Sequence, residues 1–364
     1  MSLSSSSFGK KLAIGGNSLH KSFKTILTGI AALGLTLAVS APVSAEVERL
    51  DEPRLVGHDY LPELPVSVWQ DQEKPAKGVV VAVHGLVMHG RVYDVMARKL
   101  AAQGFIVLAP DLRGYGRWQT DVQDESKAGK EDGKVQYHKS LEDLKGLVAA
   151  VSVKYPNLPL FLVGESLGAG LSIRVAEALP ESVSGLVLSS PAIKRRMYLE
   201  PEMVVQAASL VTNPMRQVDL VPYIKKFASE DPRIVEEAIN DPYVRKHLNL
   251  SELMGTASII RGNISHAHGV PASVPVLVIQ GDKDKMLRSD AVTLLLSRLR
   301  TKDRTVRWLP GKGHVLIETA HIEPSTMSTI SSWLDDHLMT PTRETYTEGL
   351  VSSGPGRTLD VYQP

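Results

Sequence analysis

The sequence has 364 residues, of which 43% are hydrophobic and 22% charged, enough to bury one sizeable core and a smaller module besides. The net charge of +1 and the lack of a long basic run exclude a nucleic-acid-binding protein of the usual basic kind. There is no cysteine, so disulfides, thiolate catalysis and cysteine metal sites are excluded as well.

The first 45 residues differ in composition from the rest of the chain. They carry four lysines but no Asp, Glu or Arg, then an uncharged apolar run over 26–39 and the small-residue ending Val43-Ser44-Ala45. A basic segment, a short apolar run and a small-residue site are the three parts of a secretory signal peptide. The pattern predicts export to the periplasm or the medium after removal of residues 1–45. The alternative is an uncleaved membrane anchor formed by residues 26–42.

Beyond residue 65, short apolar runs alternate with amphipathic stretches. The predicted strands are 79–83, 105–109, 160–163, 183–188, 276–280 and 305–309, and the predicted helices are 92–102, 137–154, 167–178, 291–299 and 327–338. Continuous apolar runs that alternate with helices indicate a mostly parallel sheet covered by helices on both faces. We therefore expect an α/β core built from residues 46–192 and 273–338, followed by a loose tail over 339–364.

The alternation stops over residues 193–272, a segment far longer than a βα loop of about 2–6 residues. Apolar residues at helical spacing predict one helix over 202–211 and another from Asp231 onward. We predict a helical cap inserted after the sixth strand. Because the other loops are short and rich in glycine, the cap should supply most of the specificity, through apolar side chains such as Met203 and Met215.

The central motif is Gly164-Glu165-Ser166-Leu167-Gly168, which lies between a predicted strand and a predicted helix. Glycines are needed there because the strand turns sharply into the helix, and the turn exposes the serine hydroxyl above the sheet. Ser166 is therefore the candidate nucleophile. Because a serine hydroxyl is nearly inert by itself, it needs a base, and the base needs a carboxylate to orient it.

The base and the acid are expected in later loops of the same fold, in the order Ser, acid, His. Asp282 and Asp284 follow the predicted strand 276–280, and His314 follows the last predicted strand. All these loops lie at carboxyl ends of parallel strands, where open α/β sheets bind ligands. We predict His314 as general base and Asp284 as the residue that orients it, with Asp282 as the competing candidate.

The oxyanion of a tetrahedral intermediate needs two backbone N–H donors. One is expected from Leu167, the residue after the nucleophile, and the other from Leu86, in the loop that begins His84-Gly85. Because His314 fills the role of base, we interpret His84 as a structural side chain that bonds loop carbonyls.

Two further clusters are interpreted as solvated surface. His266-Ala267-His268 resembles half of a metal site, but no further ligands are apparent around it in the sequence, so we expect a solvated loop and no metal. The basic run Lys194-Arg195-Arg196 is expected to be a solvated face at the start of the cap, with attraction of anionic head groups as the alternative.

Several motifs together resemble the monoacylglycerol lipase and lysophospholipase branch of the α/β-hydrolase family, which is serine aminopeptidase S33-like. They are His84-Gly85-Leu86 with His89 and Tyr93, Asp111-Leu112-Arg113-Gly114-Tyr115-Gly116, and Asn240-Asp241-Pro242 in the cap. Ser166, Asp284 and His314 match that family's triad positions. The resemblance covers about residues 79–338 and implies the α/β-hydrolase fold, a Ser-His-Asp triad, an acyl-enzyme and no cofactor.

The same resemblance implies a carboxylic-ester hydrolase that acts on monoacylglycerol- or lysophospholipid-like acyl esters. Val87 and Met88 stand where the family usually has Gly and Glu, and Trp118 stands where a small Ser is usual. The chain therefore departs from the family beside the predicted oxyanion loop and matches it at the triad. The alternatives are other triad hydrolases (a peptidase, a thioesterase or a cofactor-free haloperoxidase) and a non-catalytic binding protein.

The expected partner is a small-molecule acyl ester, with no nucleic acid. Peripheral contact of the cap with a membrane is a further expectation. The sequence predicts no particular oligomeric state.

Overall fold

The computed structural model describes residues 47–50, 64–119, 133–194, 213, 216–288 and 290–338. The predicted signal peptide or anchor, the predicted tail over 339–364 and the predicted cap helix over 202–211 lie outside these residues and stay predictions. Within the described residues, no helix combines the length and the apolar character needed to cross a membrane.

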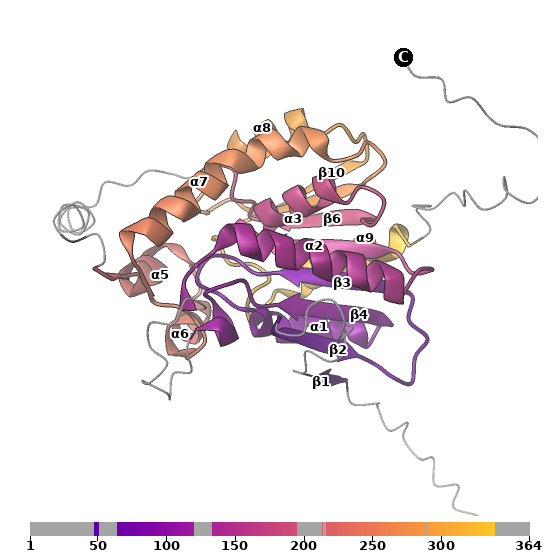
Figure 1. Cartoon of the computed structure of the whole chain (residues 1–364), viewed down its shortest axis with the longest axis horizontal. Helices are drawn as coiled ribbons and strands as arrows, with labels where there is room; N and C mark the ends of the chain where they lie inside the picture. The colour runs from indigo at the N-terminus through magenta and orange to yellow at the C-terminus, as the bar shows by residue number, and fades with distance from the viewer. Residues whose placement is uncertain are drawn as a thin grey trace, which may run out of the picture. The chain divides into compact units, whose positions relative to one another are not determined.

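The described residues form an eight-stranded sheet in the order β1-β2-β4-β3-β5-β6-β9-β10 (Figure 1). Only the pairs β1–β2 and β2–β4 are antiparallel, so the sheet is mostly parallel, as predicted. The strands are β1 (Glu48–Leu50), β2 (Val66–Gln70), β3 (Gly78–Val83), β4 (Phe105–Pro110), β5 (Leu160–Glu165), β6 (Gly185–Ser189), β9 (Val276–Gly281) and β10 (Arg304–Leu309).

Alternate residues of each inner strand face opposite sides of the sheet. On β3, Val79 and Val81 belong to the hydrophobic cluster on one face, whereas Val80 and Ala82 belong to the cluster on the other. All four side chains are fully buried. A strand that is buried on both faces must be apolar at every position, which is why these strands appear in the sequence as unbroken apolar runs.

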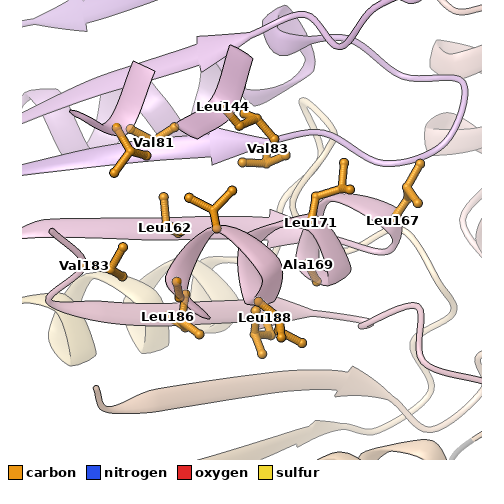
Figure 2. Close-up of a cluster of buried hydrophobic side chains, with 14 of the residues drawn as sticks. Val81, Val83, Leu144, Leu162, Leu167, Ala169, Leu171, Val183, Leu186 and Leu188 are labelled. Carbon is orange, nitrogen blue, oxygen red and sulfur yellow. The ribbon is translucent and has the colours of Figure 1, made fainter. Parts of the chain in front are cut away.

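Helices cover both faces of the sheet. α2 (Tyr137–Lys154), α3 (Leu167–Ala178), α7 (Leu250–His266) and α8 (Asp290–Arg298) contribute to the cluster on one face, and α1 (Asp94–Ala101) and α9 (Pro324–Asp336) to the cluster on the other. Figure 2 shows Leu144 of α2 next to Val83 of β3, with Leu171 of α3 facing them, and Leu162 and Leu167 belong to the same buried cluster. This packing fixes the start of α3, where the candidate nucleophile lies.

The inserted segment after β6 contains α5 (Val221–Phe227), α6 (Pro232–Asn240), α7 and the antiparallel pair β7 (Val218–Asp219) and β8 (His247–Leu248). Proline lies in the first turn of α5 and of α6, where its missing N–H has no cost. A capping box of Asn249 and Glu252 begins α7.

The inserted segment packs in two ways. Residues of α5, α6 and β8 form a separate hydrophobic cluster with Val87, Met88 and Val315 of the core loops. By contrast, α7 contributes Ile260 to the cluster on the sheet and packs along α3. The cap bounds of 193–272 stay a prediction, and the described part of this segment also supplies α7, a helix of the core layer.

Candidate active site

Ser166 lies at a sharp turn between β5, which ends at Glu165, and α3, which begins at Leu167. Its φ of 54° and ψ of −114° are unfavourable for a residue with a side chain, the kind of strain that a nucleophile turn holds. The neighbouring glycines are required. A Cβ on Gly168 would lie 1.8 Å from the carbonyl oxygen of Val83, and one on Gly164 would lie 2.5 Å from the backbone of Gly168.

Gly168→Ala should therefore destabilise the protein, because the added methyl group meets the rigid backbone of β3. We expect a loss of about 1–3 kcal/mol or more in the free energy of unfolding, measured by urea denaturation. Gly255→Ala in α7 is the matched control: its Cβ would lie 3.9 Å from the Tyr137 ring, and alanine favours a helix by about 0.5–1 kcal/mol. Equal stability of the two variants would contradict the close approach at Gly168.

The three residues predicted as a triad form one hydrogen-bonded series. His314 Nε2 lies 2.9 Å from Ser166 Oγ, and His314 Nδ1 lies 2.8 Å from Asp284 Oδ2. Since a carboxylate only accepts, Nδ1–H donates to Asp284, and Nε2 is left to accept the serine proton. This is the tautomer that a general base needs. The three residues come from the ends of β5, β10 and β9, which meet at one edge of the sheet.

Asp284 is held as a carboxylate. Its Oδ1 accepts the backbone N–H groups of Met286 and Leu287 at 2.8 and 2.9 Å, and its Oδ2 accepts from Gln280 Nε2 at 2.9 Å. Burial alone would raise the pKa of Asp284, but the charge and hydrogen bond of His314, with these donors, outweigh burial and lower the pKa to about 2.

Asp282 does not reach the histidine. Its side chain is exposed, and Oδ1 accepts the backbone N–H of Gly311 at 2.7 Å, so it ties two loops together instead. The geometry therefore places Asp284, and not Asp282, behind His314.

His314 is buried, and its basicity is set by its neighbours. Burial lowers the pKa of an imidazole, but the charge and hydrogen bond of Asp284, and then the charge of Glu165, raise the pKa of His314 above its ordinary value. A more basic histidine is a better acceptor for the serine proton.

The loop after β3 lies beside the nucleophile. A Cβ on Gly85 would come within 3.4 Å of Ser166 Cβ, so the adjacent N–H of Leu86 belongs to the edge of the site. The N–H of Leu167 begins α3, where the helix dipole favours negative charge. Among the described residues, neither N–H donates a hydrogen bond to an acceptor outside its own element. Both amides are thus free to bind an oxyanion, the role predicted for them.

His84 is structural, as predicted. It is fully buried, its Nδ1–H donates to the Gly85 carbonyl at 2.8 Å, and its Nε2 accepts the N–H of Leu112 at 3.0 Å. Burial lowers the pKa of His84 to about 4, which keeps the ring neutral and the two bonds intact.

The inserted segment holds the loop that carries Leu86. Val87 has a φ of 67°, an outlier for a β-branched residue, and its carbonyl accepts the N–H of Arg245 at 2.8 Å. His89 Nε2–H donates to Asp241 at 2.9 Å, while its Nδ1 accepts from Arg91 N. Two motifs that the sequence showed separately, one around His89 and one around Asp241, therefore meet in space.

The same segment holds the loop of His314. The Ala228 carbonyl accepts the N–H groups of His314 at 3.2 Å and Val315 at 2.9 Å, and the Glu230 carboxylate accepts the N–H of Gly313. From the sequence, we predicted that this segment serves mainly to select the substrate. Its described part also braces both loops of the site, a role that the pattern of apolar residues could not reveal.

Four polar side chains of the site were not identified as functional residues from the sequence. Ser190 donates to the His314 carbonyl at 2.7 Å, and Gln280 donates to Asp284. Glu165 and Glu318 are buried carboxyl groups beneath the site. A signal for Glu165 was present, since an acidic residue at the end of an apolar strand run must be paired when it is buried.

A cavity of about 420 Å³ lies between the segment 88–95 and the segment 234–244 of the insertion. Met88 and Glu318 contribute to its lining, but none of the three triad residues does. The cavity therefore adjoins the loop of Leu86, through Met88, and is not lined by the triad.

The interpretation of His266-Ala267-His268 as a solvated loop was wrong. His266 ends α7, and the sequence Ala267–Gly269 forms a 3-10 helix. His266 Nδ1 contacts the carboxylate of Glu177, and Nε2 contacts Arg174 at 2.9 Å. These partners lie on α3, 89 and 92 residues earlier in the chain, so the sequence alone gave no means of pairing them with His266. The histidine fastens α7 to α3.

A mostly parallel sheet, a strained turn that presents Ser166 and a Ser-His-Asp hydrogen-bonded series define a class, the α/β-hydrolase fold arranged for serine hydrolase chemistry. The family model described as serine aminopeptidase, S33, matches residues 74–319. The chain belongs to this family of serine hydrolases, and the predicted fold is confirmed.

Several proteins that resemble this chain are named monoacylglycerol or monoglyceride lipases. The chain is 28% identical over 276 residues to the monoacylglycerol lipase of Mycolicibacterium smegmatis, covering 75% of this chain and 92% of that protein. It is 25% identical over 295 residues to the monoglyceride lipase of Homo sapiens, covering 80% and 92%. The crystal structure of the Paleococcus ferrophilus monoacylglycerol lipase is similar with a TM-score of 0.61 and 26% identity, over 76% of this chain and 99% of that one.

Proposed function

We propose that this protein hydrolyses monoacyl carboxylic esters, of the monoacylglycerol or lysophospholipid class, through an acyl-enzyme on Ser166. The observation that carries the proposal is the series Ser166–His314–Asp284, with contacts of 2.9 and 2.8 Å, beside the free amides of Leu86 and Leu167. This arrangement supplies a nucleophile, a base and an oxyanion site in one place.

In the proposed reaction, Ser166 Oγ attacks the ester carbonyl while His314 Nε2 takes the serine proton. The carbonyl oxygen becomes an oxyanion, which accepts hydrogen bonds from the N–H groups of Leu86 and Leu167. His314 then gives its proton to the leaving alcohol, and the acyl group stays on Ser166. Water attacks the acyl-enzyme by the same route and releases the carboxylic acid.

The apolar side chains in the loops that carry Leu86 and His314 support a substrate with an apolar acyl chain. Val87 and Met88 are apolar and lie in one cluster with Leu220, Ile224 and Val315, which joins both catalytic loops to the inserted segment. The relatives named above are monoacylglycerol or monoglyceride lipases. Methionine and branched aliphatic side chains favour a flexible hydrocarbon tail over a charged or peptidic group.

A panel of substrates tests this proposal. We expect kcat/KM of the full chain to rise along p-nitrophenyl esters from two to about twelve carbons, because each buried methylene contributes about 0.8 kcal/mol, at most about fourfold per carbon. Monoacylglycerols and lysophospholipids should be cleaved in the same assay, and Ser166→Ala serves as the blank. Flat efficiency across acyl length would contradict the lipid substrate while leaving a serine esterase.

A second candidate is cleavage of an N-terminal peptide bond, since the matching family carries the description serine aminopeptidase. The same catalytic series can attack an amide. Aminoacyl p-nitroanilides and an acyl thioester therefore belong in the panel. A clear preference for the anilides would replace the ester proposal with a peptidase.

A further inference from the structure

Two carboxyl groups lie beneath the site and take no part in the reaction described above. Glu165 precedes the nucleophile and is fully buried, and Glu318 follows His314 by four residues and is 3% exposed. Each bonds to backbone groups of a different catalytic loop. Buried acids are costly unless they are paired or bonded, so both must have a structural or functional reason.

Glu165 is surrounded by donors. Its carboxyl oxygens accept the Ser189 hydroxyl at 2.6 Å and the three successive backbone N–H groups of Leu316, Ile317 and Glu318 at 2.9 to 3.3 Å. A protonated acid would turn one oxygen into a donor that faces other donors. The surroundings therefore fit an ionised Glu165, whose carboxylate fastens the loop just after His314.

Glu318 has surroundings of the opposite kind. Its Oε1 accepts the N–H of Gly85 at 2.5 Å and lies 3.0 Å from the Tyr93 hydroxyl. That hydroxyl has a single proton, which it donates to the Val83 carbonyl at 2.9 Å. The Tyr93 oxygen is then left as an acceptor, so the proton between Tyr93 and Glu318 must come from Glu318.

Electrostatics agrees with this assignment. Two carboxylates buried side by side cannot both ionise. Burial raises the pKa of Glu165, but the Ser189 hydroxyl, the charge of His314 and the backbone N–H groups oppose that rise. Burial, and then the charge of Glu165, raise the pKa of Glu318 well above its ordinary value. The ionisable groups that face Glu165 are His314, Glu318 and Tyr93, while His314 faces Asp284 and Glu165.

We propose that Glu165 and Glu318 form a buried carboxyl pair with one proton, carried by Glu318, and that the pair positions the two catalytic loops. Glu165 holds the loop of His314 and places a negative charge near its ring. Glu318 holds Gly85, next to the oxyanion donor Leu86. Both are positioning residues that act through His314 and Leu86, so the inference rests on the catalytic roles proposed for those two.

Amide substitution should affect the two positions differently. In Glu318→Gln, a neutral amide replaces a neutral acid. Because the contacts with Gly85 and Tyr93 are both made at Oε1, the amide oxygen can keep the bond from Gly85 N–H but cannot donate to Tyr93. The bond that holds the Leu86 loop is retained, so kcat should fall only about threefold. Glu318→Leu loses both bonds and should fall about a hundredfold, the scale expected when a catalytic loop is misplaced. The conservative variant thus rescues the function at this position.

In Glu165→Gln, the amide NH₂ group faces N–H donors, and the negative charge near His314 is lost. We expect kcat for p-nitrophenyl butyrate to fall about a hundredfold with little change in KM. The acid limb of the pH profile of kcat/KM should move to lower pH, because His314 loses a charge that raises its pKa. Glu142→Gln on the exposed surface of α2 is the control, with unchanged kinetics.

A measurement on the unmodified full chain tests the proton directly. Infrared spectroscopy at neutral pH should show the carbonyl band of a protonated carboxylic acid, and Glu318→Gln should remove it. Absence of the band, or its loss in a folded Glu165→Gln variant but not in Glu318→Gln, would overturn the assignment. Equal kinetic losses in the two amide variants would overturn it as well. A chain without esterase activity would still show the band, so failure of the proposed function is a separate result.

Discussion

Ser166→Ala is expected to reduce kcat on any ester substrate by about a million-fold, as when a residue is removed from a triad that acts as a unit. The variant keeps the turn, the glycines and the oxyanion amides, so substrate binding should be retained. The loss is measured in the p-nitrophenyl ester assay, with binding followed by calorimetry using a non-hydrolysed ether analogue.

Ser152→Ala, a partly buried serine on α2, is the matched control and should leave kcat unchanged. Retention of even a tenth of the activity in Ser166→Ala would mean that another residue attacks the ester.

Asp284→Asn is expected to reduce kcat by about ten-thousand-fold, because an amide that donates to Nδ1 leaves His314 in the wrong tautomer. Asp282→Asn should be mild, since an amide oxygen can still accept the N–H of Gly311. Both variants are measured by steady-state kinetics across pH. If the two effects were reversed, the acid of the site would be Asp282.

The pH dependence of kcat/KM is a second test of the role of Asp284. Its pKa of about 2 keeps it ionised throughout the working range, so the acid limb of kcat/KM belongs to His314. Because the charge of Asp284 raises the pKa of His314, the limb should lie above the ordinary histidine value of 6.5. Removing that charge lowers the pKa of His314, and the residual activity of Asp284→Asn should therefore have its limb at lower pH.

The parts of the fold that depend on local pattern could be predicted from the sequence. Strands buried on both faces must be apolar throughout, so β3, β4, β5 and β9 could be located as apolar runs. The sharp turn at Ser166 requires glycine at 164 and 168, which made the motif visible. The loops of Asp284 and His314 follow strand ends, and parallel strands bring those ends together.

Contacts between distant segments could not be predicted in the same way. Glu165 was visible inside the motif, but its partners at 316–318 lie about 150 residues further along the chain. The bond between His89 and Asp241 joins two motifs that the sequence gives no means of pairing. The strained φ of Val87 was also hidden, because valine at that position has no local sign of positive φ.

The bracing of the site by the inserted segment has a consequence for engineering the protein. Ala228, Glu230 and Arg245 hold the loops of His314 and Leu86, so removing residues 216–249 should impair the hydrolysis of short as well as long esters. A separable cap, which selects substrates and nothing else, does not fit these contacts.

The central claim is that Ser166 is an activated nucleophile, and labelling with a fluorophosphonate probe tests it most directly. The full chain, incubated with the probe and digested, should carry one phosphonate on the peptide that contains Ser166, as mapped by mass spectrometry. Labelling should be blocked by prior incubation with a slowly hydrolysed ester and absent in Ser166→Ala. A folded protein that remains unlabelled, or a label on another serine, would contradict the account.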